Sequence, residues 1–111
     1  MRVISQDGTM DVPYEISSFS IAVGKYENVE HAVIFCYNYS TSIGTKIAEY
    51  CSKEKAKKAM EMLRIAYENN EFYHHTANSE LFTEFAKALG EEMFKKFTSE
   101  YFQFPAEEEL E

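Results

Sequence analysis

Few residues of this 111-residue chain combine the types and the spacing that chemistry requires, and the adjacent pair His74-His75 is the first candidate. Neighbouring side chains on a strand or a helix point in different directions, so one such pair rarely supplies two ligands to one metal ion. The sequence contains neither a His-Glu-x-x-His nor a Cys-x-x-Cys motif that would complete a site. We therefore assign no metal to the pair and expect it on an exposed connecting segment.

The two cysteines are the candidate nucleophiles, provided that a neighbouring cation lowers the pKa of the thiol. Cys36 lies within an apolar run, where cysteine usually packs as a small buried hydrophobe. Cys51 precedes a predicted helix cap, and the positive end of that helix would favour its thiolate, so Cys51 is the better candidate. Two cysteines this far apart do not make a disulfide framework, so we expect reduced thiols in a cytoplasmic protein.

Other motifs are weaker. Residues 6–9 and 42–45 contain glycine but lack the glycine spacing and the following helix of a phosphate loop. Acid–base catalysis needs two carboxylates in one cleft, which spacing alone does not establish. The abundant acidic residues include Asp7, Asp11, Glu15, Glu27, Glu30 and Glu49. We assign no catalytic, cofactor-binding or metal-binding residue, expect no cofactor, and favour a non-enzymatic role over an enzymatic one.

The composition of the chain limits the classes of partner that the protein is expected to bind. The net charge of −8 disfavours direct binding to nucleic-acid phosphates or to an anionic membrane. No apolar run approaches the ~20 residues of a membrane span, and the N-terminus lacks a secretion signal. Eight tyrosines and nine phenylalanines exceed what a chain of this size readily buries, which favours a contact face for a protein partner or a second copy. A local basic patch comprises Lys53, Lys55, Lys57 and Lys58.

The elements that would position these residues begin with strands. Residues 2–5 and 10–12 are predicted to pair through a turn at Asp7-Gly8, with Pro13 ending the second strand. Alternation of apolar residues predicts a strand over residues 18–23, interrupted after that by residues 24–28. The strongest strand spans residues 32–39, and its two apolar faces indicate a central position. The remaining predicted strands are residues 43–51, with Gly44 as a bulge, and residues 101–104, stopped by Pro105.

Two helices follow from the pattern. Ser52 caps the first, and Asn69-Asn70 ends it because asparagine tolerates the left-handed conformation. Its apolar stripe comprises Ala56, Ala59, Met60, Leu63 and Tyr67. After a connector over residues 71–78, Asn78 or Ser79 caps a second helix, which Gly90 weakens or divides. The second stripe comprises Phe82, Phe85, Ala86, Leu89, Met93 and Phe97.

Together these patterns predict an α+β fold, a mainly antiparallel sheet of about four to six strands with two helices packed on it. Residues 1–105 are expected to form a single domain. Residues 106–111 are expected to form an acidic, disordered tail, in which Leu110-Glu111 has the sequence of a common cloning junction.

Several segments resemble a group of small uncharacterised phage and prophage proteins of Gram-positive bacteria. They are residues 1–8 and 11–15 at the start, 48–50, 52–56 and 59–63 in the middle, and 101–109 at the end. Residues 71–100 do not contribute. The resemblance implies a phage or mobile-element protein in a bacterial cytoplasm and implies no activity.

Three functional hypotheses follow. The leading one is a phage-type accessory protein that acts as a non-enzymatic protein–protein interaction module and binds a bacterial protein or itself, as a homodimer. The second, based on the charge of −8, is an acidic decoy of a nucleic-acid-binding surface. The third is a small thiol-dependent enzyme using Cys51 or Cys36.

Overall fold

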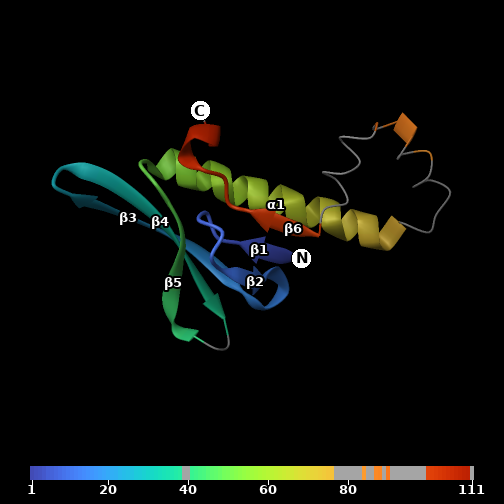
Figure 1. Ribbon diagram of the computed structural model, residues 1–111, viewed down its shortest axis with the longest axis horizontal. Helices are drawn as coiled ribbons and strands as arrows, with labels where there is room; N and C mark the ends of the chain where they lie inside the picture. The colour runs from blue at the N-terminus through green and yellow to red at the C-terminus, as the bar shows by residue number, and fades with distance from the viewer. Residues whose placement is uncertain (39–40, 77–83, 85–86, 89, 91–99, 111) are drawn as a thin grey trace.

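The computed structural model describes residues 1–38, 41–76, 84, 87–88, 90 and 100–110 and confirms the α+β class (Figure 1). Its strands and helices follow one another in the order β1 (Arg2–Ile4), β2 (Asp11–Pro13), the 3-10 helix η1 (Tyr14–Ile16), β3 (Ser18–Tyr26), β4 (Val29–Asn38), β5 (Thr41–Tyr50), α1 (Lys53–Thr76), β6 (Tyr101–Gln103) and the 3-10 helix η2 (Glu107–Leu110).

The strands form two three-stranded sheets, ordered β2-β1-β6 and β3-β4-β5. The predicted single sheet of four to six strands is therefore wrong. β1 pairs antiparallel with β2, as the Asp7-Gly8 turn predicts, but parallel with β6. The two sheets separate because η1 follows Pro13 and turns the chain before β3 begins.

The second sheet is antiparallel throughout, and β4 is its central strand as predicted. Glu27 and Asn28 have φ of 51° and 66°, the positive values of a tight two-residue hairpin turn. The chain therefore turns at Glu27-Asn28 and not at Gly24. Strand β3 continues through Gly24 to Tyr26, beyond the predicted end of the strand. The β3–β4 hairpin projects past the start of α1 (Figure 1).

The pairing of β4 with β5 shifts register near Gly44, between Cys36 and Asn38, as the bulge prediction expects. A Cβ atom at Gly44 would lie 2.6 Å from the Tyr37 ring, so any other residue there would require this ring to move. A further shift leaves Ile47 as an extra residue on β5, and its side chain is buried in the core.

Helix α1 begins as predicted, since the Ser52 hydroxyl accepts a 3.2 Å hydrogen bond from the Lys55 N–H. It runs to Thr76, so the predicted end at Asn69-Asn70 and the connector over residues 71–76 are wrong. Asparagine is less favourable than alanine in a helix by at most ~0.7 kcal/mol, which is too small a preference to end a helix by itself. Asn70 lies within α1 and is 1% exposed. The predicted second apolar stripe lies outside the described residues, whereas Gly90 is described and has φ of 80°.

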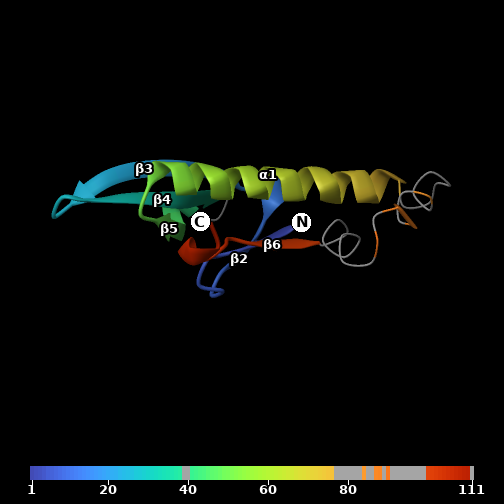
Figure 2. The same ribbon diagram turned by 90° about the horizontal axis from the view of Figure 1, so that it is seen from above.

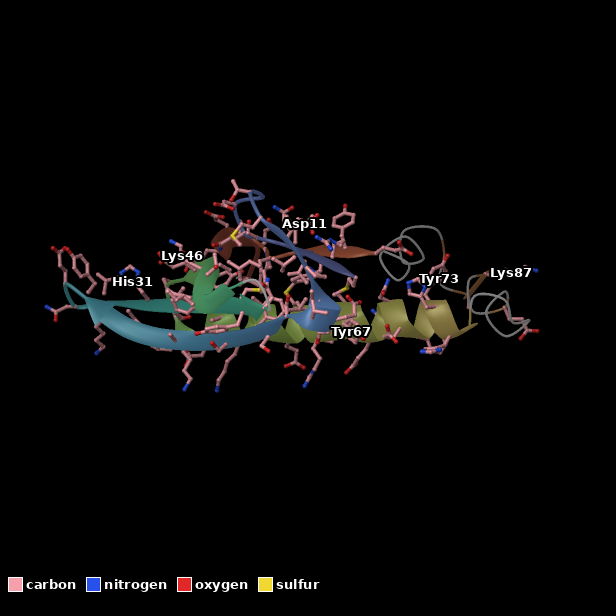
Figure 3. The ribbon with its side chains drawn as sticks, turned by 90° about the horizontal axis from the view of Figure 1, so that it is seen from below. Asp11, His31, Lys46, Tyr67, Tyr73 and Lys87 are labelled. Carbon is pink, nitrogen blue, oxygen red and sulfur yellow. The ribbon has the colours of Figure 1, made fainter. Side chains whose placement is uncertain are left out.

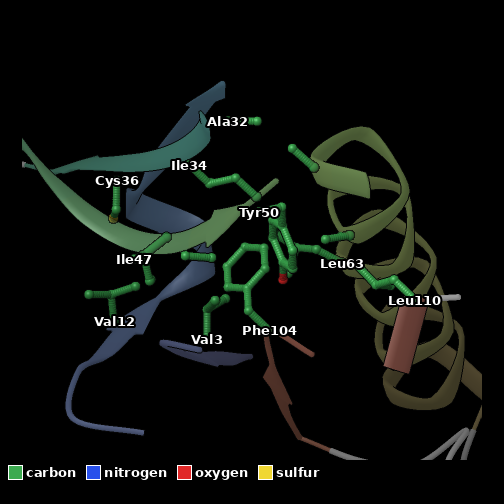
Figure 4. Close-up of a cluster of buried hydrophobic side chains, with 13 residues drawn as sticks. Val3, Val12, Ala32, Ile34, Cys36, Ile47, Tyr50, Leu63, Phe104 and Leu110 are labelled. Atoms are coloured by element: carbon green, nitrogen blue, oxygen red, sulfur yellow. The ribbon is translucent and has the colours of Figure 1, made fainter. Parts of the chain in front are cut away.

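One core joins the two sheets and α1 (Figure 4). The inner face of the β3-β4-β5 sheet meets α1 near one end of β4 and the β2-β1-β6 sheet near the other. Tyr50 and Phe104 lie between these layers, and Leu63 reaches them from α1. The predicted α1 stripe is confirmed at Ala56, Ala59 and Leu63, which are buried, while Met60 is partly buried.

The chain end differs from the predicted disordered tail. Glu107–Leu110 forms η2, and Leu110 is only 4% exposed. The Lys58 Nζ donates a 3.2 Å hydrogen bond to the Leu110 carbonyl oxygen. An acidic run does not reveal this arrangement, because the apolar partners of Leu110 come from elsewhere in the chain. Leu110 therefore belongs to the packed core.

Candidate functional site

His74 and His75 lie in the last turn of α1 rather than on a connector. His74 Nε2 is 3.5 Å from the Glu100 carboxylate, and His75 Nε2 is 3.4 Å from that of Glu71. The two imidazoles thus face different carboxylates. Among the described residues, no group of three His, Cys, Asp or Glu side chains could hold a metal ion.

The structure does not activate either thiol. Burial raises the pKa of Cys36, which lies in the core. Cys51 is exposed, but its thiol donates a hydrogen bond to the Glu107 carboxylate, which raises its pKa. The expectation that the α1 N-terminus favours the Cys51 thiolate is therefore wrong, because η2 brings a carboxylate to the same place. Glu107 also accepts a hydrogen bond from the Cys51 backbone N–H.

Residues 6–9 form a tight turn in which polar groups satisfy one another. Asp7 accepts hydrogen bonds from the Ser5 hydroxyl at 2.7 Å, the Thr9 hydroxyl at 2.7 Å and the Thr9 N–H at 3.0 Å. These bonds lower the pKa of Asp7 to about 2. The donors that a phosphate would need are thus already used by the turn.

The lysines of the predicted basic patch make different contacts. Lys55 Nζ lies 4.0 Å from the Glu107 carboxylate, and Lys58 binds the Leu110 carbonyl, so both face η2. Lys57 instead lines a groove between α1 and β3. Lys55, Lys57 and Lys58 therefore do not act as one cationic surface.

That groove, which we call the α1–β3 groove, is lined by residues of η1, β3 and α1. Its volume is about 730 Å³. Phe19 and Ile21 from β3 face Met60 and Leu63 from α1 across it. Four charged residues also line it: Glu15, Lys57, Glu61 and Arg64. It combines an apolar floor with a polar rim, the composition typical of a binding site.

Aromatic stacking closes one end of the groove. The rings of Tyr14 and Tyr67 stack with centroids 4.1 Å apart, and Phe19 follows at 6.1 Å from Tyr14. Figure 3 shows Tyr67 on α1 beside the ribbon that leads into β3. Glu15 stands at the same end, where its hydrogen bond with the N-terminal ammonium lowers its pKa. This end therefore holds the ion pair of Glu15 and the N-terminal ammonium next to aromatic rings.

The β3 strand borders the groove with an open edge. Within the described residues β3 pairs with β4 alone, and Figure 2 shows β3 and α1 along one margin of the molecule. The other sheet edge, β5, is partly occupied, since the Gln6 N–H donates a 2.9 Å hydrogen bond to the Ile47 carbonyl. The open edge of this sheet is therefore the nine-residue strand β3.

The register shows which backbone groups of β3 are available. Tyr26 and Val29 flank the two-residue turn, so they form a hydrogen-bonded pair. Bonded and non-bonded pairs alternate along an antiparallel ladder. Counting back along β3, the residues that direct N–H and C=O groups away from β4 are Lys25, Val23, Ile21 and Phe19. The backbone groups available at the edge thus belong to the residues that share the groove side of the sheet.

Sequence reasoning missed this site. The alternation of Phe19, Ile21 and Val23 indicated their shared face but not that α1 would leave part of it open. The one available signal was the near absence of charge from β3, whose single charged residue is Lys25. Natural edge strands usually carry charge or proline to prevent pairing, and β3 has little such protection.

Comparison with known proteins finds no matching family model, no matching curated protein and no matching solved structure. Within the described part of the chain, no helix is both long enough and apolar enough to cross a membrane.

Proposed function

We propose that this protein is a non-enzymatic interaction module that binds an extended segment of another polypeptide. The segment adds a strand to the β3 edge and places alternate side chains in the α1–β3 groove. The single observation that carries the proposal is the coincidence of an open strand edge with an apolar groove beside it. The phage-type accessory role in a bacterial cytoplasm is proposed on the motif resemblance alone.

Two kinds of contact would act together. Backbone hydrogen bonds to Phe19, Ile21 and Val23 would supply affinity that is independent of the bound sequence. Because side chains on a strand alternate between faces, every second residue of the segment would enter the groove. Its apolar floor favours aliphatic or aromatic residues there, and the stacked rings at one end favour a lysine or arginine.

The alternative functions receive less support from the described residues. A thiol enzyme needs a thiol of lowered pKa, and the pKa of both thiols is raised. An acidic decoy needs carboxylates on one face. Several described carboxylates instead pair with nearby cationic groups on separate elements, as Asp11 does with Arg2, Glu61 with Arg64 and Glu107 with Lys55.

A displayed library of random peptides tests the proposal. We expect selected peptides to share alternating apolar residues and to shift the NMR amide signals of Phe19, Ile21 and Val23. Ile21→Lys places a charge in the groove and should weaken binding by at least tenfold. Ile65→Lys is the matched control, because Ile65 is a half-exposed apolar residue of α1 that does not line the groove. The affinity of this variant for the selected peptides should equal that of the wild-type protein.

Two results would overturn the proposal. One is a library that gives no binder with alternating apolar residues. The other is a set of peptides whose affinity is equal for the wild-type protein and Ile21→Lys, because their site would then lie elsewhere. Circular dichroism of both variants establishes that they keep the wild-type secondary structure.

A further inference from the structure

We propose that the segment bound at the β3 edge is β3 of a second copy of this chain. The two copies would form a homodimer with one continuous six-stranded sheet, three strands from each copy. This inference rests on the proposed function, since it names the occupant of the same edge and groove. It is carried by the register, the side-chain complementarity and the charge of β3.

The register of β3 allows pairing with itself. Two antiparallel β3 strands can align so that Ile21 faces Val23 of the second copy and Phe19 faces Lys25 of the second copy. All four residues direct their backbone groups outward, so each of these pairs would form the hydrogen-bonded type. Ala22 then faces Ala22 of the second copy on a two-fold axis. The arrangement is closed, as most homo-oligomers are.

Side chains of the two copies match on the groove side. Val23 is 47% exposed although it shares the core-facing side of β3, where its cross-strand partner Ala32 is fully buried. In the dimer it would lie against Ile21 of the second copy and cover the mouth of that copy's groove. Each copy would thus bury apolar surface that neither buries alone.

Lys25 would meet aromatic rings at the end of the second copy's groove. Lys25 is the single charged residue of β3, in a chain whose net charge is −8. In this register it would stand beside Phe19 of the second copy, at the groove end that holds Tyr14, Tyr67 and the Glu15 carboxylate. An ammonium is attracted by aromatic faces. The Lys25 ammonium would thus lie against the stacked rings of the second copy.

The side chains on the other face of β3 do not obstruct the pairing of two β3 strands. Its residues there are Ser18, Ser20, Ala22 and Gly24, which are small, and then Tyr26. Ser20 would face Gly24 of the second copy on either side of the axis. No bulky pair would therefore collide near the axis.

Disulfide trapping provides a sharp test of this register. Residues opposite each other in a non-hydrogen-bonded pair have Cα atoms about 4.5 Å apart, within the range that a disulfide spans. In a Cys51→Ser background, Ala22→Cys should therefore form a symmetric disulfide dimer under a glutathione redox buffer. Ser20→Cys and Gly24→Cys are matched controls on the same face. Alone, each lies ~14 Å from its own counterpart and should not cross-link.

A mixed experiment covers the case in which Ala22→Cys does not fold. Ser20→Cys mixed with Gly24→Cys should give a heterodimeric disulfide, because these positions face each other across the axis. Neither variant should cross-link when it is oxidised alone. Light scattering on the untreated wild-type protein should give twice the chain mass of 12.9 kDa, and Ile21→Lys should give the monomer mass.

A wild-type monomer at millimolar concentration would overturn the inference. Cross-linking of Ser20→Cys or Gly24→Cys alone, without cross-linking of Ala22→Cys or of the mixture, would overturn it as well, because the strands would then pair in another register. Neither result affects the proposed function, which fails only if selected peptides do not use the β3 edge. A monomer that still binds such peptides at β3 would show that the occupant is a different protein.

Discussion

The phenolic hydroxyl of Tyr50 donates a 2.8 Å hydrogen bond to the carbonyl oxygen of Pro105, and both residues are buried. The bond joins the end of β5 to the segment between β6 and η2. Burial raises the pKa of Tyr50 above its ordinary value, so the hydroxyl stays protonated as a donor. The contact ties the two sheets together across 55 positions of sequence.

Tyr50→Phe should therefore destabilise the protein. It removes one donor to the buried Pro105 carbonyl, which keeps a 3.3 Å hydrogen bond from the Gln6 side chain. The free energy of unfolding should therefore fall by about 0.5–1.5 kcal/mol. Urea denaturation followed by circular dichroism measures the change. Tyr26→Phe removes a hydroxyl from a side chain that is 70% exposed, and its change should stay within about 0.5 kcal/mol. Equal stability of the two variants would contradict the assigned role of the bond.

Leu110→Ala tests whether η2 is part of the core. Truncation of a buried leucine lowers the free energy of unfolding by about 2–5 kcal/mol. Ile43→Ala is the matched control, because Ile43 is 80% exposed and its truncation should change stability by no more than about 1 kcal/mol. Urea denaturation gives both values. A disordered tail would make Leu110→Ala indistinguishable from wild type.

Asp7→Asn should destabilise the β1–β2 turn in a manner that depends on pH. The folded pKa of Asp7 is about 2, below the ordinary value of 3.8. The carboxylate therefore contributes stability that is complete above the unfolded pKa and is lost as the pH falls through the folded pKa. Wild type should be the more stable protein at pH 6, and the difference should shrink between pH 3.8 and about pH 2.

Thermal unfolding of both proteins across that pH range measures the difference, and NMR titration of the Asp7 carboxyl carbon measures its pKa. A constant difference between pH 6 and pH 2 would show that the loss of stability does not come from ionisation of Asp7.

Glu107→Ala should make the Cys51 thiol react faster. The hydrogen bond from the thiol to Glu107 and the negative charge of this carboxylate both raise the thiol pKa, and the variant removes both. The rate of labelling by a disulfide reagent should rise at pH 8, with the midpoint of its pH profile shifted to lower pH.

Glu108→Ala controls for a general change in charge, since Glu108 is an exposed neighbour. Its labelling profile should match that of wild type. A Glu107→Ala profile with an unchanged midpoint and a higher plateau would instead indicate better access to the thiol, and the electrostatic explanation would then fail.

Local chemistry determined several parts of this protein. The Asp7-Gly8 turn follows from the tolerance of glycine for positive φ, and the start of α1 follows from a side-chain cap at Ser52. The central position of β4 follows from a strand that is apolar on both faces. In each case the residues that decide the structure are neighbours in sequence, so their pattern is sufficient.

Tertiary structure alone decided the remainder. The parallel pairing of β1 with β6, the burial of Leu110 and the continuation of α1 past Asn70 each join residues that are far apart in the chain. The candidate site also depends on contacts between residues that are far apart in the chain. Alternation placed Phe19 and Ile21 on one face, but only the position of α1 made that face a groove and left the β3 edge open. A pattern records which side chains avoid water, whereas their partners depend on how separate elements pack.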